Sequence, residues 1–162
     1  MRKQILLVFL LFALVSCQNE TYVFSEYKTL GGTWKASDTL HFELAAKDTI
    51  ALNNLYFHIR ATQKYPYNNI FIIATLNFPN GKTLVDTLEY DMAFPDGKLM
   101  GSGGSIKESL LWYKQNVQFL EEGTYQISLR QANRKASETD ADQDLEGIEE
   151  VGLAIEKKIP NE

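Results

Sequence analysis

The sequence predicts an all-β protein, in which a two-sheet antiparallel β-sandwich of immunoglobulin-like or jelly-roll type follows a cleaved signal helix. Several short segments alternate apolar and polar residues, which directs one set of side chains into a core and the other toward solvent. Gly, Pro and Asn turns separate about nine such segments. No stretch beyond residue 21 follows the period of a helix over a dozen residues. Periodicity leaves the choice between the two topologies open.

The first seventeen residues have the organisation of a bacterial lipoprotein signal peptide. Two cations, Arg2 and Lys3, precede an unbroken apolar run over residues 5–15. This run is too short for a permanent membrane span, which needs about 20 apolar residues. Ser16 is small and lets a peptidase approach the backbone, while Cys17, the only cysteine, supplies the thiol that takes a diacylglycerol group. The alternative is a plain secretory signal with a chance cysteine.

These features divide the chain into a signal peptide (residues 1–16), an acylated cysteine with a short tether (residues 17–21) and a β-sandwich domain (residues 22–162). Removing residues 1–16 from 162 leaves 146, the size of one domain. About two or three acyl chains on Cys17 would hold it in a lipid bilayer, since each buried methylene adds about 0.8 kcal/mol. Cleavage reduces the 16 basic residues to 14, against 21 acidic ones. The resulting charge of −7 argues against a nucleic-acid partner.

Alternation predicts both the strands and the core. The alternating segments, in chain order and bounded by turn or loop residues, are 22–27, 40–45, 55–60, 117–120, 125–130 and 151–155. The side chains predicted to point inward are Phe42, Leu44, Leu55, Phe57, Ile59, Phe71, Ile73, Tyr125, Ile127, Leu129, Val151, Leu153 and Ile155.

Two further segments have less regular patterns. Residues 70–78 are almost continuously apolar and are expected to form a central strand that is covered on both faces. Residues 106–114 are ambiguous, because Ile106, Leu110 and Tyr113 could also form one face of a short helix.

An internal repeat marks two tight turns. The sequence Phe-Pro-Asn-Gly-Lys at residues 78–82 recurs as Phe-Pro-Asp-Gly-Lys at residues 94–98. Proline fixes the φ angle that a turn requires, and Asn-Gly or Asp-Gly supplies the positive φ values that close a hairpin. Since residues 82–91 between the turns are strand-like, we expect a meander of three antiparallel strands.

The sequence contains no recognisable catalytic set. There is no G-x-S-x-G motif, no HExxH motif and no glycine-rich phosphate loop before a helix, so we expect no enzyme activity and no cofactor. His41 and His58 lie on the polar sides of their predicted strands and are expected to be ordinary surface residues. Asp140, Asp142 and Asp144 could converge on calcium, but the glycine and bidentate glutamate of an EF-hand loop are missing. A solvated acidic loop without a metal is the favoured interpretation.

Aromatic side chains offer an alternative binding function. Rings exposed together on one face could form a platform on which sugars stack, although aromatics of β-sandwiches more often pack in the core or at an edge. The candidates for this platform are Tyr56, Tyr65, Tyr67, Trp112 and Tyr113.

Several blocks in order resemble one known family. Residues 60–71 (RATQKYPYNNIF) resemble the R-x-T-x-x-Y-P-Y-x-N-hydrophobic-F signature of the GldH family, the gliding-motility lipoproteins of the Bacteroidetes. Residues 78–90 (FPNGKTLVDTLEY) and the block around residues 95–114 resemble the family sequence that follows. Residues 147–156 resemble its C-terminal signature, so the resemblance covers essentially the whole mature chain. The loop at 134–144 is longer and more acidic than the family pattern.

The resemblance implies a non-catalytic envelope role rather than an activity. Members of the family are lipoproteins of the gliding machinery, which is linked to type IX secretion, so protein partners from that machinery are expected. Gln18 follows the cysteine where an aspartate would retain a lipoprotein in the inner membrane, and this indicates the outer membrane, with the periplasmic face favoured over the cell surface. The alternative is a glycan- or solute-binding surface lipoprotein.

One segment is a candidate contact surface. Arg60 offers a rigid fork of donors, Tyr65 and Tyr67 flank a proline, and Asn69 can both donate and accept hydrogen bonds. Tyrosine and arginine are enriched at interface hot spots. We also expect this arrangement to favour a cis peptide bond before Pro66. In the alternative interpretation, the tyrosines pack over the end of the sandwich and Arg60 ties down the loop.

The anchor generates the first testable prediction. Replacing Cys17 by alanine removes the thiol that accepts the lipid, so the chain should remain unprocessed or become soluble. Membrane fractionation and electrophoretic mobility measure both effects. Unchanged fractionation together with unchanged mobility would contradict acylation at this position.

Overall fold

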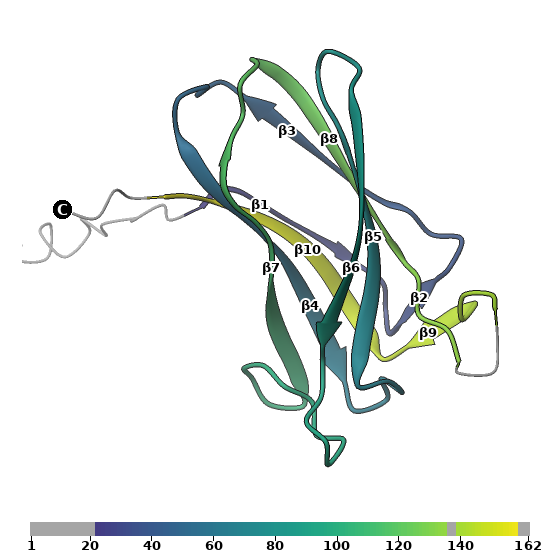
Figure 1. The fold of residues 1–162 in the computed structure, drawn as a ribbon. Helices are drawn as coiled ribbons and strands as arrows, with labels where there is room; N and C mark the ends of the chain where they lie inside the picture. The colour runs from purple at the N-terminus through teal and green to yellow at the C-terminus, as the bar shows by residue number, and fades with distance from the viewer. Residues whose placement is uncertain (1–21, 136–138, 159–162) are drawn as a thin grey trace, which may run out of the picture.

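The computed structural model describes residues 22–135 and 139–158, which form a two-layer antiparallel β-sandwich (Figure 1). The predicted all-β fold is confirmed, and within these residues no helix is long and apolar enough to cross a membrane. The expectations for the signal peptide, Cys17 and its tether lie outside the described residues. The strands are β1 (Tyr22–Thr29), β2 (Thr33–Lys35), β3 (Leu40–Ala46), β4 (Leu52–Thr62), β5 (Asn69–Asn77), β6 (Thr83–Asp91), β7 (Ile106–Gln118), β8 (Gly123–Gln131), β9 (Asp144–Glu146) and β10 (Ile148–Lys157).

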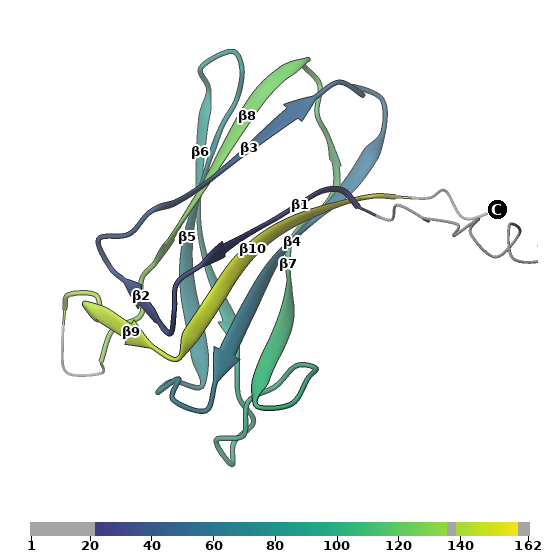
Figure 2. The same ribbon diagram turned by 180° about the vertical axis from the view of Figure 1, so that it is seen from behind.

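Two four-stranded sheets make up the layers. Sheet 1 has the strand order β1-β10-β4-β7, and sheet 2 has the order β3-β8-β5-β6. Every pairing within them is antiparallel. A two-stranded ribbon of β2 and β9 lies on the side of the sandwich away from the start of β1 and the end of β10 (Figures 1 and 2). Each sheet therefore joins strands that are distant in sequence.

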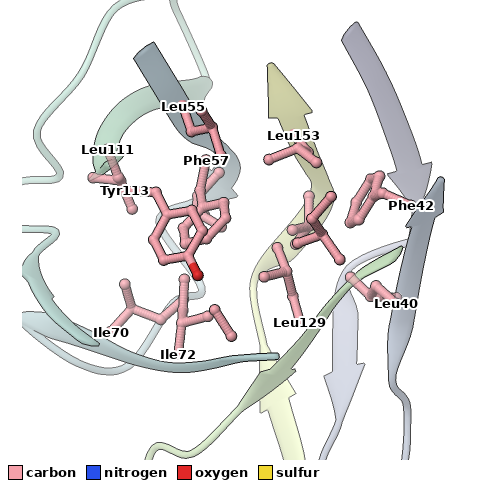
Figure 3. Packing of buried hydrophobic residues seen from close by; sticks show 14 of the residues in the cluster. Leu40, Phe42, Leu55, Phe57, Ile70, Ile72, Leu111, Tyr113, Leu129 and Leu153 are labelled. Carbon is pink, nitrogen blue, oxygen red and sulfur yellow. The ribbon is translucent and has the colours of Figure 1, made fainter. Parts of the chain in front are cut away.

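The core lies between the two sheets (Figure 3). The ring of Phe57 in β4 stacks on that of Tyr113 in β7 with centroids 4.6 Å apart, and Ile72 of β5 faces them from sheet 2. Eleven of the predicted core side chains are buried, with exposed fractions of 7% or less: Phe42, Leu44, Leu55, Phe57, Ile59, Tyr125, Ile127, Leu129, Val151, Leu153 and Ile155.

The prediction for β5 has the wrong register. Ile70 and Ile72 are fully buried, whereas Phe71 and Ile73 lie half-buried on the opposite face. There they line a hollow of about 440 Å³ together with Thr87 and Arg130 of sheet 2 and with residues that follow β8, among them Ala132 and Arg134. The strand is central in its sheet, but it is not covered on both faces. A continuous apolar run carries no alternation, so the sequence alone could not choose the inward set.

The predicted three-stranded meander is only half correct. The turn at residues 78–82 joins β5 and β6 into a hairpin, as expected. The second turn closes on itself, because the Phe94 amide donates to the Lys98 carbonyl at 2.9 Å and Ala93 bridges Leu99. The chain then crosses to sheet 1, since β6 is already the edge of sheet 2.

The ambiguous segment after this turn is a strand. Residues 106–118 form β7, which pairs with β4, so the helical interpretation is wrong. Leu111 and Tyr113 point into the core, which leaves Leu110 and Trp112 on the outer face. Burial of alternate residues against β4 and sheet 2 outweighs a helical spacing that covers fewer than three turns.

Adjacent isoleucines on β5 test the corrected register. Ile72→Ala removes a fully buried side chain and should lower the free energy of unfolding by about 2–5 kcal/mol. Ile73→Ala, a matched control one residue away, should cost less than half as much, because its side chain is half-buried on the outer face. Urea unfolding of both variants measures the difference. Equal losses would show that both faces of β5 are covered alike.

Candidate functional site

The outer face of sheet 1 brings together polar side chains from four strands. Because alternate residues of a strand face the same side, the pairing register arranges these side chains in rows across β1, β10, β4 and β7. The first row, here called the charged row, is Thr29, Glu150, Arg60 and Glu108. The next two rows are Tyr27, Gly152, His58 and Leu110, followed by Ser25, Ala154, Tyr56 and Trp112.

Arg60 is the centre of the charged row. Its Nε atom lies 3.1 Å from Glu108 Oε2, and its Nη1 atom lies 2.6 Å from Glu150 Oε2. The guanidinium carbon also lies 5.2 Å from the centre of the Tyr27 ring. Partly exposed ion pairs of this kind contribute little stability. Their effect is positional, because they hold the guanidinium fork in one orientation while 40% of the side chain stays exposed.

His58 is not the surface residue that the sequence predicted. Its exposed fraction is 7%, and its Nδ1 atom donates to Glu108 Oε1 at 2.8 Å. The ring of Tyr27 covers it with an edge contact of 5.3 Å between centroids. This ring lies over Gly152, where a Cβ atom would come within 2.8 Å of it. The missing side chain at Gly152 therefore allows Tyr27 to bury His58, whereas His41 is exposed as predicted.

The surroundings shift the pKa values of Glu108 and Tyr27 in opposite directions. Burial opposes ionisation of Glu108, but the hydrogen bonds from His58 and Arg60 outweigh it, so the pKa of Glu108 is lowered from its ordinary value of 4.5. Burial and the adjacent Glu108 carboxylate raise the pKa of Tyr27 to about 12. At neutral pH, Glu108 is thus an anion and Tyr27 remains a hydrogen-bond donor.

A hollow of about 360 Å³ opens beside the charged row. Its lining includes Arg60 and Ile106, together with the carboxylates of Glu108, Glu149 and Glu150. Within the described ranges, no three His, Cys, Asp or Glu side chains are grouped so that they could hold a metal ion. The hollow thus places the Arg60 guanidinium among three carboxylates, and these groups can form hydrogen bonds with a polar ligand or partner.

Apolar side chains continue the same face along β7. Leu110 is 49% exposed and Trp112 is 48% exposed. The Trp112 ring packs against that of Tyr56 in β4, with centroids 4.4 Å apart. Tyr56 is itself buried and donates its hydroxyl to Glu156. An ordered tryptophan beside a polar cluster has the composition of an interface hot spot.

The predicted aromatic platform is not formed. Tyr56, Tyr65 and Tyr113 are buried, Tyr67 is half-buried, and only Trp112 among the five candidates is exposed. The packing role that the sequence offered as an alternative applies to four of these rings.

The four predicted contact residues lie in two places. Arg60 belongs to the charged row, whereas Tyr65, Tyr67 and Asn69 lie around the connection from β4 to β5. The Tyr65 hydroxyl donates to the Asn69 carbonyl at 2.6 Å, and the Tyr67 hydroxyl donates to Asp142 at 2.7 Å. The Asn69 side chain donates to Glu89 at 2.6 Å. No peptide bond in the described ranges is cis, so the expected cis bond before Pro66 is absent.

The acidic loop is used for structure. Asp142 accepts the hydrogen bond from Tyr67, and its carbonyl accepts one from Gln131. Asp144 begins β9, opposite Lys35 of β2. Asp142 and Asp144 are thus held in different parts of the structure, the first by hydrogen bonds and the second by strand pairing.

Sequence reasoning missed Glu108, Leu110 and Trp112 as parts of one surface. The signal was present, because a strand over residues 106–114 places every second residue on one face. Because the sequence left residues 106–114 ambiguous between helix and strand, it did not show which of their side chains share one face. Glu150 and Tyr27 could be added only from the register between β1, β10 and β4.

Comparison with known proteins shows similarity to one family of lipoproteins. The family profile described as GldH lipoprotein matches residues 22–155. The "Gliding motility lipoprotein GldH homolog" of Christiangramia forsetii is 42% identical over 151 residues, which cover 93% of this chain and 92% of the relative. The "Gliding motility lipoprotein GldH" of Flavobacterium johnsoniae is 43% identical over 146 residues, which cover 90% of each chain.

Solved structures resemble the chain only distantly. The infectious bursal disease virus VP2 subviral particle gives a TM-score of 0.35 at 13% identity, covering 84% of this chain and 30% of that one. A similarity at this level supports no argument about function.

The lowered pKa of Glu108 yields a pH-dependent prediction. Glu108→Gln removes the charge that Arg60 and His58 contact, and at pH 7 it should lower the free energy of unfolding by about 1–2 kcal/mol, mainly because the buried His58 loses its charged hydrogen-bond acceptor. Because the pKa is lower in the folded state, the contribution of this carboxylate is complete above the unfolded value and disappears as pH falls through the folded value. The gap between wild type and variant should therefore shrink from pH 7 to pH 3. Urea unfolding measures it, with the exposed Glu122→Gln as control. A gap that does not change with pH would contradict the assignment.

Proposed function

Because this chain belongs to the GldH lipoprotein family, we propose that it is a lipid-anchored, non-catalytic protein of the cell envelope that contacts protein partners of the gliding-motility machinery. The proposed contact surface, here called the sheet 1 surface, consists of the charged row with Leu110 and Trp112. The observation that carries the proposal is the exposed, packed Trp112 on the same outer face as the fixed guanidinium of Arg60, two rows along β7.

The lipoprotein signal and the kinship together support lipid anchoring. The proposed anchor is acylated Cys17, and Gln18 after it favours the outer membrane. The periplasmic face is the proposed location, because the partners of gliding and of the linked type IX secretion machinery are envelope components. The single cysteine is consumed by acylation in this proposal, so the folded domain carries no free thiol.

The composition of the sheet 1 surface favours a protein partner. Hot spots combine tryptophan, tyrosine and arginine with surrounding residues that exclude water. Trp112 and Leu110 supply apolar area, and Arg60 adds a donor fork that ion pairs already hold in place, so binding requires little further ordering. A sugar-binding site would require several exposed ring faces, whereas Tyr56 turns its buried ring against Trp112.

In our proposal, the connection from β4 to β5, which contains Tyr65, Tyr67 and Asn69, holds the sheet 1 surface in place. Gly147 lies at a φ angle of +82°, and a Cβ atom there would come within 2.3 Å of the Tyr65 backbone nitrogen. The turn before β10 is thus packed directly on the segment after β4. Tyr65 fixes this junction from inside, with Tyr67 and Asn69 at its surface, and so holds the ends of the strands that carry Arg60 and Glu150.

The sheet 1 surface can be tested directly. A Leu110→Ser, Trp112→Ala double variant should remain folded and membrane-associated, because both side chains are about half exposed, but it should lose most crosslinking to its partner and most gliding in a gliding host. Val85→Ser is the matched control, since Val85 is an exposed apolar residue of sheet 2. Crosslinking yield in native envelopes and motility on agar are the measurements. Equal effects in the control, or full function in the folded double variant, would contradict this surface.

A further inference from the structure

The described chain starts and finishes at the same end of the sandwich. Tyr22 at the start of β1 lies opposite Glu156, and Lys157 near the end of β10 lies opposite Asn53 at the start of β4. Two connections flank this place: residues 47–51 between β3 and β4, and residues 119–122 between β7 and β8. Figures 1 and 2 show the start of β1 and the end of β10 side by side at this end. We call it the tethered end.

The tethered end concentrates exposed apolar side chains. Ile50 is 83% exposed and Leu120 is 73% exposed, the highest values among the large hydrophobic side chains described. At the same end, Val23, Leu52 and Tyr22 are 54%, 42% and 40% exposed. Single exposed hydrophobic side chains are common on proteins, but several of them at one end of a domain indicate an interaction site.

Hydrogen bonds order the loop that carries Ile50. Asp48 accepts from the amides of Ile50 and Ala51 at 3.0 and 2.9 Å, and it pairs with Lys157 at 2.9 Å. The Lys157 contact and the two backbone hydrogen bonds lower the pKa of Asp48 to about 2. Gln118 also donates to the Thr49 carbonyl at 2.8 Å. The exposed position of Ile50 is thus a property of an ordered loop.

The second loop is ordered in a similar way. Phe119 is buried, and its ring contacts that of Tyr125 with centroids 4.9 Å apart. The Tyr125 hydroxyl donates to the Glu121 carbonyl at 3.2 Å. Phe119 and Glu121 are therefore held on either side of Leu120, which projects from the loop. Both loops present one apolar side chain each beyond the core.

We propose that the tethered end rests on the lipid bilayer, with Ile50 and Leu120 inserted among the head groups and upper acyl chains. This inference depends on the proposed acylation of Cys17. From residue 17 to residue 22 an extended chain reaches roughly 18 Å at most, so the acyl chains hold this end close to the membrane. The opposite end lies farther away, because the 11 residues of β4 extend over roughly 36 Å.

The chemistry of this contact is apolar. Cations at the tethered end are Lys47, Lys157 and Lys158, while the acidic residues there are Asp48, Glu121, Glu122 and Glu156. A mixed charge of this kind gives no net attraction to anionic lipids. The contact should therefore form on neutral lipid and persist at high salt, in contrast to a polybasic patch.

Site-specific fluorescence in the acylated full chain tests the contact. Acylation leaves no free thiol, so cysteines introduced as Ile50→Cys, Leu120→Cys and Phe94→Cys can each be labelled with an environment-sensitive dye. Phe94 is the matched control, because it is 47% exposed in the turn after β6, at the opposite end. The protein is reconstituted into phosphatidylcholine vesicles with and without doxyl-labelled lipid and with and without an anionic lipid.

Labels at positions 50 and 120 should shift to the blue and be quenched by doxyl lipid at least about threefold more strongly than the label at 94, equally in neutral and anionic vesicles. Near-ultraviolet circular dichroism confirms that each variant is folded. Vesicle flotation without quenching at 50 and 120 would overturn the inference and leave the anchor intact. A blue shift without doxyl quenching would also overturn it, in favour of a protein contact. Failure of the protein to float would remove the acyl anchor, and with it both proposals.

Discussion

The packing of the inner faces of the two sheets is the interaction on which the rest of this structure depends. The chain has one cysteine, so no disulfide can join the layers, and the stacked rings of Phe57 and Tyr113 with the aliphatic side chains around them hold the layers together. Once alternate residues of β4, β7 and β10 are fixed inward, their neighbours are fixed outward by the pleat of the strands. The arrangement of Arg60, Glu108 and Glu150 is thus a consequence of core packing.

The cluster of Arg60, Glu108, His58 and Tyr27 on the outer face of sheet 1 lowers stability, and core packing must offset this loss. His58 is buried with its Nε2 atom lacking a partner among the described residues, and an unmet donor or acceptor of this kind costs about 1–3 kcal/mol. The ion pairs of Arg60 are partly exposed and return little of this. What the cluster provides is order, because the rings of Tyr27 and His58, the glycine at 152 and two carboxylates together restrict one guanidinium. Such order on an outer face is the property that a recognition surface requires.

Sequence patterns predicted those parts of the fold where alternation is clean. The strands around Phe42, Phe57 and Ile127 have one apolar face, and their inward side chains were correctly identified. The pattern failed at Ile72 and Ile73, because two apolar neighbours leave the register to be decided by strand pairing. The burial of His58 depends on Gly152, almost a hundred residues away, and on Tyr27 beyond it. No local sequence pattern contains a relationship of that kind. Of the charged row and the residues around it, the sequence therefore predicted only Arg60 as a contact residue.

β7 connects the two surfaces that the structure singles out. It begins at Ile106 beside the charged row, carries Leu110 and Trp112 along its length, and ends at Gln118 next to the loop of Leu120. The strand is an edge of sheet 1, but its side toward sheet 2 is occupied: Tyr90 donates to the Trp112 carbonyl at 2.7 Å, and Lys114 pairs with Asp86 at 2.8 Å. These contacts blunt the edge against further strand pairing. A domain resting on the membrane at Leu120 would then present Trp112 and Arg60 at a set height above the bilayer, where the proposed contact with an envelope partner would form.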